Sequence, residues 1–143
     1  MSNHPARLYD FLLFAHVLAA FCLLAMVVIY TAFVMGDPAP RRGVLLAQAL
    51  DGVGGIGTLV FGVWLALYID GYELWDGWII AALVLWAAAA ETGRRTHAAL
   101  EPAFAGQSEG RASAVARAAV RWHVIRTALI VLLLAVMIFK PGV

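Results

Sequence analysis

Residues 11–35 read FLLFAHVLAAFCLLAMVVIYTAFVM, a run of 25 residues that contains no Asp, Glu, Lys or Arg. A helix needs about 20 apolar residues to cross the hydrocarbon core of a bilayer, which is about 30 Å thick. This run is therefore long enough to span a membrane as one helix. Outward from it, three further apolar runs predict three more spans, at residues 48–69, 76–95 and 119–139.

The composition indicates a membrane protein. Hydrophobic types make up 64% of the 143 residues and charged types 13%, whereas soluble domains average about 45–50% apolar and about 25% charged residues. This excludes a soluble enzyme and a disordered tail. Cys22 is the single cysteine, which excludes a disulfide scaffold, and a net charge of +1 gives no reason to expect a nucleic-acid partner. We expect one all-α, polytopic transmembrane domain over residues 1–143, an antiparallel four-helix bundle in contact with the lipid bilayer.

The placement of basic residues predicts the orientation. The two termini and the 70–76 turn contain 2 of the Lys and Arg residues, and the other two connections with their flanks contain 8. Since cytoplasmic loops carry an excess of Lys and Arg, we expect both termini to lie outside the cytoplasm. The patterns of residues 91–104 and 113–123 are helical, with glycines between them. We therefore expect the third and fourth helices to extend as a cytoplasmic hairpin that turns near residues 105–110.

Small residues recur along the second apolar run. The segment Gly52-Val-Gly54-Gly-Ile-Gly57 matches the dinucleotide-binding pattern G-x-G-x-x-G, but that pattern needs a preceding strand and a βαβ unit, for which this chain has no room. Helix packing explains the glycines better, because small residues let two helix backbones approach closely. One small residue recurs at every fourth position in a stripe made of Gly54, Thr58, Gly62 and Ala66. This stripe packs either inside the bundle or against a second copy in a homodimer.

Two charged residues lie deep within the predicted spans. Counted along the helical rise from the outer boundary, Glu91 lies about 22 Å deep and Arg126 about 21 Å deep. An unpaired charge at that depth is costly, so we expect an ion pair between Glu91 and Arg126 of neighbouring helices. Two alternatives stay open. The side chains extend separately to the interface, or Glu91 pairs along its own helix with Arg94 or Arg95.

The same depth estimate places four polar residues near the cytoplasmic interface, namely Asp51, Arg94, His97 and His123. They form either a site where protons or ions enter or a polar network that ties the helix ends together. No Ser/His/Asp set, phosphate loop or pair of catalytically spaced carboxylates can be assembled from the sequence, so no catalytic residue is assigned.

His16 lies inside the first predicted span, about 9 Å below the outer boundary. No second ionisable ligand shares its level, and zinc needs three or four ligands, so a zinc site is not expected. A haem iron can use one histidine, and a two-fold dimer would supply two copies of His16. An ionisable residue inside a membrane is a functional candidate by default. His16 is therefore a candidate ligand or proton carrier, and the alternative is a structural histidine bonded to a carbonyl.

Several short motifs give the chain a resemblance to a known group. They are Phe14-Ala-His16-Val-Leu-Ala, the glycine-rich second run, Thr92-Gly-Arg-Arg95 and the ending Met137-Ile-Phe-Lys-Pro-Gly142. On these features the chain resembles, over nearly its whole length, an uncharacterised family of small bacterial four-helix integral membrane proteins, a domain of unknown function. That family is distantly similar to the copper-resistance D membrane proteins and to the HemJ type of protoporphyrinogen oxidase. The resemblance implies a bacterial inner membrane and a haem b associated with a first-helix histidine, which here is His16.

Three functions are expected from these features. The leading one is a small accessory or subunit protein of the inner membrane, which binds other transmembrane helices through its small-residue surfaces. The second is a haem-associated redox or transport protein that uses His16. The third is an ion or proton pathway through Glu91, Arg126 and Asp51.

Overall fold

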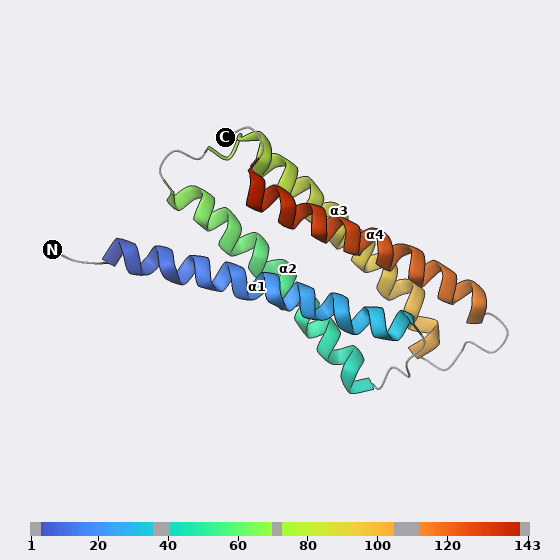
Figure 1. Ribbon diagram of the computed structural model, residues 1–143. Coiled ribbons are helices and arrows are strands. Elements are labelled where there is room, and N and C mark those ends of the chain that lie inside the picture. The colour runs from blue at the N-terminus through green and yellow to red at the C-terminus, as the bar shows by residue number, and fades with distance from the viewer. Residues whose placement is uncertain (1–3, 36–40, 70–72, 105–111, 141–143) are drawn as a thin grey trace.

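The computed structural model describes residues 4–35, 41–69, 73–104 and 112–140. Within these ranges the chain is all-helical (Figure 1), and its helices are α1 (His4–Val34), α2 (Arg41–Tyr68), α3 (Gly77–Phe104) and α4 (Ala112–Phe139). Each of the four predicted apolar runs lies inside one of these helices or extends beyond it by a single residue.

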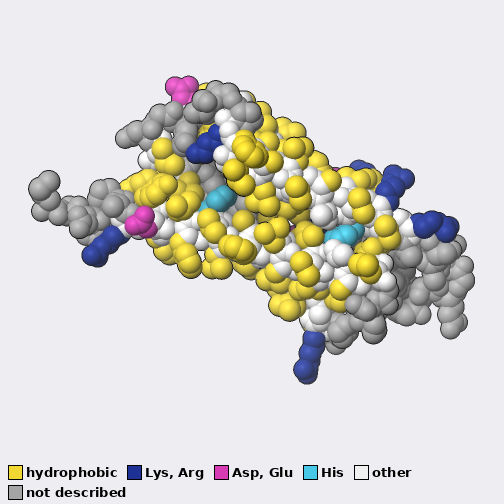
Figure 2. All heavy atoms as spheres, in the orientation of Figure 1, with side chains coloured by type: hydrophobic (Ala, Val, Ile, Leu, Met, Phe, Trp, Pro, Cys, Tyr) yellow, Lys and Arg dark blue, Asp and Glu magenta, His cyan; other side chains and the backbone are white. Residues whose placement is uncertain are grey.

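Three of the helices, α1, α2 and α4, are long and apolar enough to cross a membrane, judged by length and composition of the described residues. α3 is not among them, since Glu91, Arg94 and Arg95 interrupt its apolar sequence. Hydrophobic side chains cover most of the described surface in Figure 2. The most exposed large ones include Phe14, Val28, Ile56, Leu67 and Ile138. So much exposed apolar surface fits a lipid environment better than an aqueous one.

The helices are arranged as two pairs. α1 packs mainly against α2, and α3 packs mainly against α4, while smaller contacts of α1 with α4 and of α2 with α3 join the pairs. In Figure 1 α3 and α4 run together in the upper part of the view, and α1 crosses α2 below them. Polar side chains and cavities lie in the space between the two pairs.

The buried positions follow the spacing of packed helices. On α1 they recur at intervals of three, four or seven residues, and on α4 at intervals of three or four. Such intervals place side chains on one face of a helix, where they pack against a neighbouring helix. The α1 set is Leu12, Ala19, Leu23, Met26 and Tyr30, and the α4 set is Ala119, His123, Arg126, Ile130 and Leu133. Polar side chains thus share the inward-facing positions with the apolar ones.

The small-residue stripe of α2 faces the interior of the chain. A Cβ at Gly54 would lie 2.9 Å from the backbone nitrogen of Leu23 and 3.0 Å from the backbone oxygen of Ala19, so α1 and α2 approach this closely because residue 54 has no side chain. The remaining members of the stripe also face inward, namely Thr58, Gly62 and Ala66. A contact with a second copy would therefore have to use another surface.

α3 and α4 both continue beyond the predicted spans. α3 extends nine residues past residue 95, to Phe104, and α4 begins seven residues before residue 119, at Ala112. These extensions agree with the helical patterns predicted at residues 91–104 and 113–123. The predicted turn near residues 105–110 lies outside the described residues.

Candidate functional site

One residue from each helix contributes to a network of hydrogen bonds between the two helix pairs, referred to as the Asp51 network. Its members are Tyr30 of α1, Asp51 of α2, His97 of α3 and Arg126 of α4. The hydroxyl oxygen of Tyr30 lies 2.9 Å from Nδ1 and 3.2 Å from Nε2 of His97. Nε2 of His97 lies 3.0 Å from Oδ2 of Asp51, and Arg126 donates from Nη2 to Oδ1 of Asp51. One carboxylate therefore joins α3 and α4 to α2.

The donors and acceptors of the Asp51 network follow from its chemistry. A carboxylate only accepts, so His97 donates its Nε2–H to Asp51. Nδ1 of a neutral His97 then accepts from the Tyr30 hydroxyl. Three titratable groups are thus linked in one hydrogen-bonded series. A histidine that takes a proton on one ring nitrogen and releases it from the other can carry protons along such a series.

Burial divides the Asp51 network into covered and accessible members. Tyr30 is fully buried and Arg126 is 3% exposed, whereas the side chains of Asp51 and His97 are 19% and 27% exposed. Both accessible side chains, with Arg126, line a cavity of about 610 Å³ between the helix pairs, which we name the Asp51 cavity. Its apolar walls include Leu23, Ile56, Trp86, Ile130 and Leu133. The cavity is therefore lined by a few polar side chains and is mostly apolar over the rest.

Arg126 is buried next to its counter-charge. Its guanidinium lies against Gly93 of α3, where a Cβ would be 2.6 Å from Cζ of Arg126. Nε and Nη1 of Arg126 are buried and have no hydrogen-bond partner in the described part of the chain. The neighbouring Asp51 carboxylate compensates the charge, which a low-dielectric interior requires.

His123 belongs to a smaller contact beside the Asp51 network. The Thr31 hydroxyl donates to the carbonyl of Val27, at 2.8 Å. His123 therefore donates its Nε2–H to the Thr31 oxygen, at 2.9 Å. The rings of His123 and Tyr30 lie 6.4 Å apart, measured between centroids. His123 is thus close to the Asp51 network but linked to α1 through a different residue.

The prediction of an ion pair between Glu91 and Arg126 is wrong. Glu91 accepts from Arg94 at 2.8 and 2.9 Å and from Arg95 at 2.8 Å, on an exposed face of α3. Glu91 therefore pairs along its own helix, which is one of the two alternatives that the sequence left open. Arg126 pairs with Asp51 instead. Arg94 is therefore also not part of the cluster expected with Asp51 and the two histidines. Depth along a helix gives the height of a residue but not the face on which it lies, and Glu91 and Arg126 lie on different faces.

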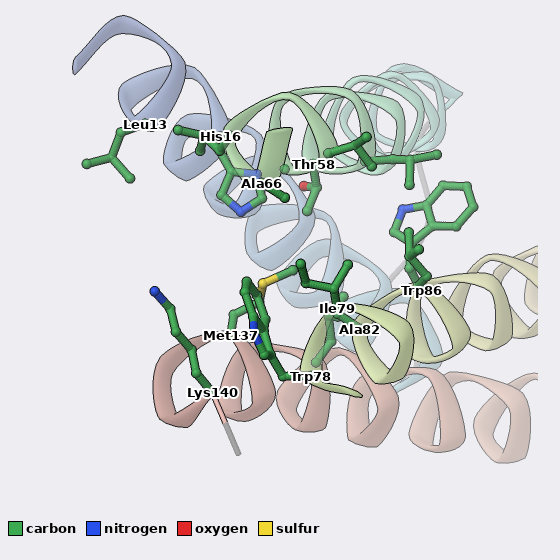
Figure 3. Close-up of a pocket in the computed structure, with 16 residues that line it drawn as sticks. Leu13, His16, Thr58, Ala66, Trp78, Ile79, Ala82, Trp86, Met137 and Lys140 are labelled. Atoms are coloured by element: carbon green, nitrogen blue, oxygen red, sulfur yellow. The ribbon is translucent and has the colours of Figure 1, made fainter. Parts of the chain in front are cut away.

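His16 lines a second cavity, of about 270 Å³, referred to as the His16 cavity. Figure 3 shows His16 and Thr58 on one side of it and Trp78, Met137 and Lys140 on the other. Nδ1 of His16 and the hydroxyl oxygen of Thr58 are buried without a hydrogen-bond partner among the described residues. The structure does not bring His16 together with the Asp51 network.

The two cavities are neighbours. Trp86 and Leu133 line both of them. The indole N–H of Trp86 donates to the carbonyl of Gly55, at 2.9 Å, and so ties α3 to α2 between the cavities. Thr58, which lines the His16 cavity, is seven residues from Asp51 on α2, or about 10 Å along the helix axis.

Tyr30 is the member of the Asp51 network that the sequence reading missed. It lies in the first apolar run, where an aromatic residue counts toward a membrane span. The available signal is the spacing, since Tyr30 follows the buried Leu23 and Met26 at intervals of seven and four residues. That spacing assigns its hydroxyl to the interior, where a polar atom needs a partner.

No group of three or more His, Cys, Asp or Glu side chains that could hold a metal ion occurs among the described residues. No protein-family model, curated protein or solved structure matches the chain.

Proposed function

We propose that the chain is a small integral membrane protein in which the Asp51 network accepts and releases protons as part of a proton pathway. The observation that carries the proposal is the hydrogen-bonded series from Tyr30 through His97 to Asp51, assembled from three helices. Of the three functions expected from the sequence, a proton pathway agrees best with this geometry. Asp51 belongs to both the expected and the proposed pathway, His97 takes the place of Glu91, and Arg126 pairs with Asp51.

The exposed surface of Asp51 and His97 distinguishes a proton pathway from a network that only holds helices together. Ionisable groups inside a membrane are expensive and tend to face a bundle interior or a water-filled cavity. Asp51 and His97 both border the Asp51 cavity and retain exposed surface there. They can therefore exchange protons with water or a ligand in the cavity, while Tyr30 and Arg126 stay covered.

We place the protein in a bacterial inner membrane as an antiparallel bundle of four spans, with both termini outside the cytoplasm. The distribution of Lys and Arg supports this orientation, with 8 on one side and 2 on the other. In this arrangement α3 crosses the membrane over about residues 77–95, with the contacts of Glu91 near its cytoplasmic end. The Asp51 network then lies in the cytoplasmic half, and the His16 cavity in the outer half.

Proton flux into vesicles tests the proposed function. The purified protein is reconstituted into liposomes that contain a pH-sensitive dye, with valinomycin and K⁺ to cancel the membrane potential, and the outside is acidified. The protein should acidify the interior faster than it does in protein-free vesicles, and His97→Gln should remove most of the difference. A reconstituted, folded protein that gives the protein-free rate contradicts the proposal.

Haem b bound through His16 is the second candidate function. The observation in its favour is that Nδ1 of His16 is buried and has no hydrogen-bond partner within the described ranges, while His16 and Met137 line the same cavity. Histidine and methionine are both axial ligands of haem iron, so the two residue types agree with the group that the family resemblance implies. A bound haem would supply one-electron redox chemistry, and His16 and Met137 would hold it.

An absorbance spectrum tests the haem candidate. The protein is purified from haem-replete cells, and a Soret band should be present. His16→Ala should abolish the band, while the matched variant His123→Ala, outside the His16 cavity, should retain it. A colourless preparation from these cells contradicts the haem candidate and leaves the proton pathway untouched.

Association with other transmembrane helices remains part of the proposal as a secondary role. The small-residue stripe of α2 is covered by α1, so a partner helix would contact the exposed apolar faces. Phe11, Phe14 and Phe21 of α1 form one such face, each more than half exposed.

A further inference from the structure

We propose that the Asp51 cavity binds a neutral, membrane-soluble phenol, whose hydroxyl donates a hydrogen bond to the Asp51 carboxylate. This inference deepens the proposed function, because it names a ligand class for the site at which protons are exchanged. Its test is binding, which can be measured whether or not protons flow.

The size and polarity of the Asp51 cavity suit a small amphipathic molecule. A volume of about 610 Å³ lies within the range of about 300–1,000 Å³ found for small-molecule sites. The polar lining residues of the cavity are Gln48, Asp51, His97 and Arg126, and most of the others are apolar, such as Ile56 and Leu133. A ligand that fits has one polar head and an apolar body.

Charge selects a neutral head that donates a hydrogen bond. The charges of the Asp51 carboxylate and the Arg126 guanidinium cancel each other. An ionic head of either sign would therefore add an uncompensated charge to a low-dielectric site, which is costly. The Arg126 side chain is 4% exposed and that of Asp51 is 19% exposed, so Asp51 is the accessible member of this pair. Its carboxylate is an acceptor, which a hydroxyl can satisfy without adding charge.

The shape of the cavity favours an aromatic ring. Gly52 and Gly55 of α2 line it, and a Cβ at either position would meet nothing within 4 Å. They leave part of the wall without side chains, next to the indole of Trp86 on α3, which donates to the Gly55 carbonyl. A planar ring can lie along such a wall and contact the indole.

The opening of the cavity faces the membrane. Four lining residues of α2 and α3 are themselves exposed at the surface, namely Gln48, Gly52, Ile56 and Ala90. α2 and α3 also pack against each other less than either packs against its main neighbour. A membrane-soluble ligand can therefore enter sideways between these two helices.

Four probes of similar apolar size separate the head-group chemistries. They are para-heptylphenol, its methyl ether para-heptylanisole, para-heptylbenzoate and para-heptylphenyltrimethylammonium, each titrated calorimetrically into the purified full-length protein in lipid nanodiscs. The phenol should bind saturably, at one site per chain. The ether should bind at least about tenfold more weakly, because a hydrogen bond to a charged group contributes about 1.5–3 kcal/mol. Equal binding of phenol and ether, or tighter binding of either charged probe, overturns the proposal.

A cavity-filling variant locates the site. Gly52→Leu adds a side chain where the structure has space, so the protein should fold, and its helix content can be checked by circular dichroism. The matched control is Val53→Leu, on the neighbouring position of α2, which is 63% exposed and does not line the cavity. Saturable phenol binding should be lost in the folded Gly52→Leu variant and retained in Val53→Leu. Retention in both variants overturns the proposal.

The outcomes for the two proposals are distinguishable. Phenol binding without proton flux in the wild-type protein contradicts the proton pathway and supports the ligand assignment. Proton flux that Gly52→Leu reduces, together with no saturable phenol binding, supports the pathway and overturns the ligand assignment.

Discussion

Arg126 of α4 lies so close to Gly93 of α3 that a Cβ at residue 93 would be 2.6 Å from its guanidinium carbon. The absence of a side chain at residue 93 therefore makes room for the buried cation between α3 and α4. From this place Arg126 reaches across to Asp51 of α2. A glycine on one helix thus positions an arginine of a second helix against the carboxylate of a third.

Gly93→Ala should destabilise the protein and disturb the Asp51 network. The added methyl group forces the guanidinium away from α3 and weakens its bond to Asp51, and crowding of a packed interior costs about 1–3 kcal/mol. Unfolding by SDS titration from mixed micelles measures the free energy. The control is Gly55→Ala, where a Cβ would meet nothing within 4 Å, and which should be neutral or stabilising because alanine favours helices. Equal stability of the two variants would show that Arg126 does not depend on Gly93.

Asp51 and Arg126 should be energetically coupled. Asp51→Asn leaves the Arg126 charge buried without compensation, which costs about 3–5 kcal/mol in known buried pairs. Adding Arg126→Gln should recover part of that loss, so the double variant is more stable than the two single losses predict. The same cycle with Glu91→Gln in place of Asp51→Asn should be additive, because Glu91 bonds Arg94 and Arg95 instead. Additive losses for Asp51 and Arg126 would contradict the assignment of this pair.

Tyr30→Phe should weaken both the fold and proton movement. The variant removes the hydroxyl that lies 2.9 Å from Nδ1 of His97, and the loss of one such bond costs about 0.5–1.5 kcal/mol. Proton uptake by vesicles should also slow, since the series then begins at His97. If the stability falls but the flux is unchanged, Tyr30 has only a structural role.

The orientation is tested by labelling single cysteines in a Cys22→Ser background. Glu73→Cys lies between α2 and α3, and Ala98→Cys lies on an exposed face of α3. In intact spheroplasts a membrane-impermeant maleimide should label position 73 at once, and position 98 only after the membrane is opened. The reverse pattern would place both termini in the cytoplasm.

Helices α1, α2 and α4 are predictable from sequence because their apolar runs are long enough to cross a bilayer. A run such as 11–35 has no charge over a length that matches the membrane, and every backbone polar group inside a bilayer must be paired within a helix. Counting along the helices also gives heights, so Asp51 and His97 are correctly expected at one level. Both predictions need only the rise per residue and the thickness of the bilayer.

The partners within the Asp51 network are harder to predict, because they depend on rotation about each helix axis. Glu91 comes two residues after the buried Ala89, which at 3.6 residues per turn places it about 200° away, on the opposite face. Arg126 instead falls on the inward-facing positions of α4. Depth alone therefore predicts that Glu91 and Arg126 are partners. The intervals between buried positions show instead that Glu91 points away from the interior and that Arg126 points into it.

The most direct test of proton transfer through Asp51 is to compare proton uptake by Asp51→Asn and Glu91→Gln in vesicles prepared in the same way. Both variants remove one carboxylate charge, but only Asp51 belongs to the network. Proton uptake by Glu91→Gln should match the wild-type rate, while uptake by Asp51→Asn should fall at least about tenfold, since a residue that transfers protons typically contributes about 10²–10⁴ in rate. Equal rates for a folded Asp51→Asn variant and the wild-type protein would contradict the claim that protons pass through this site.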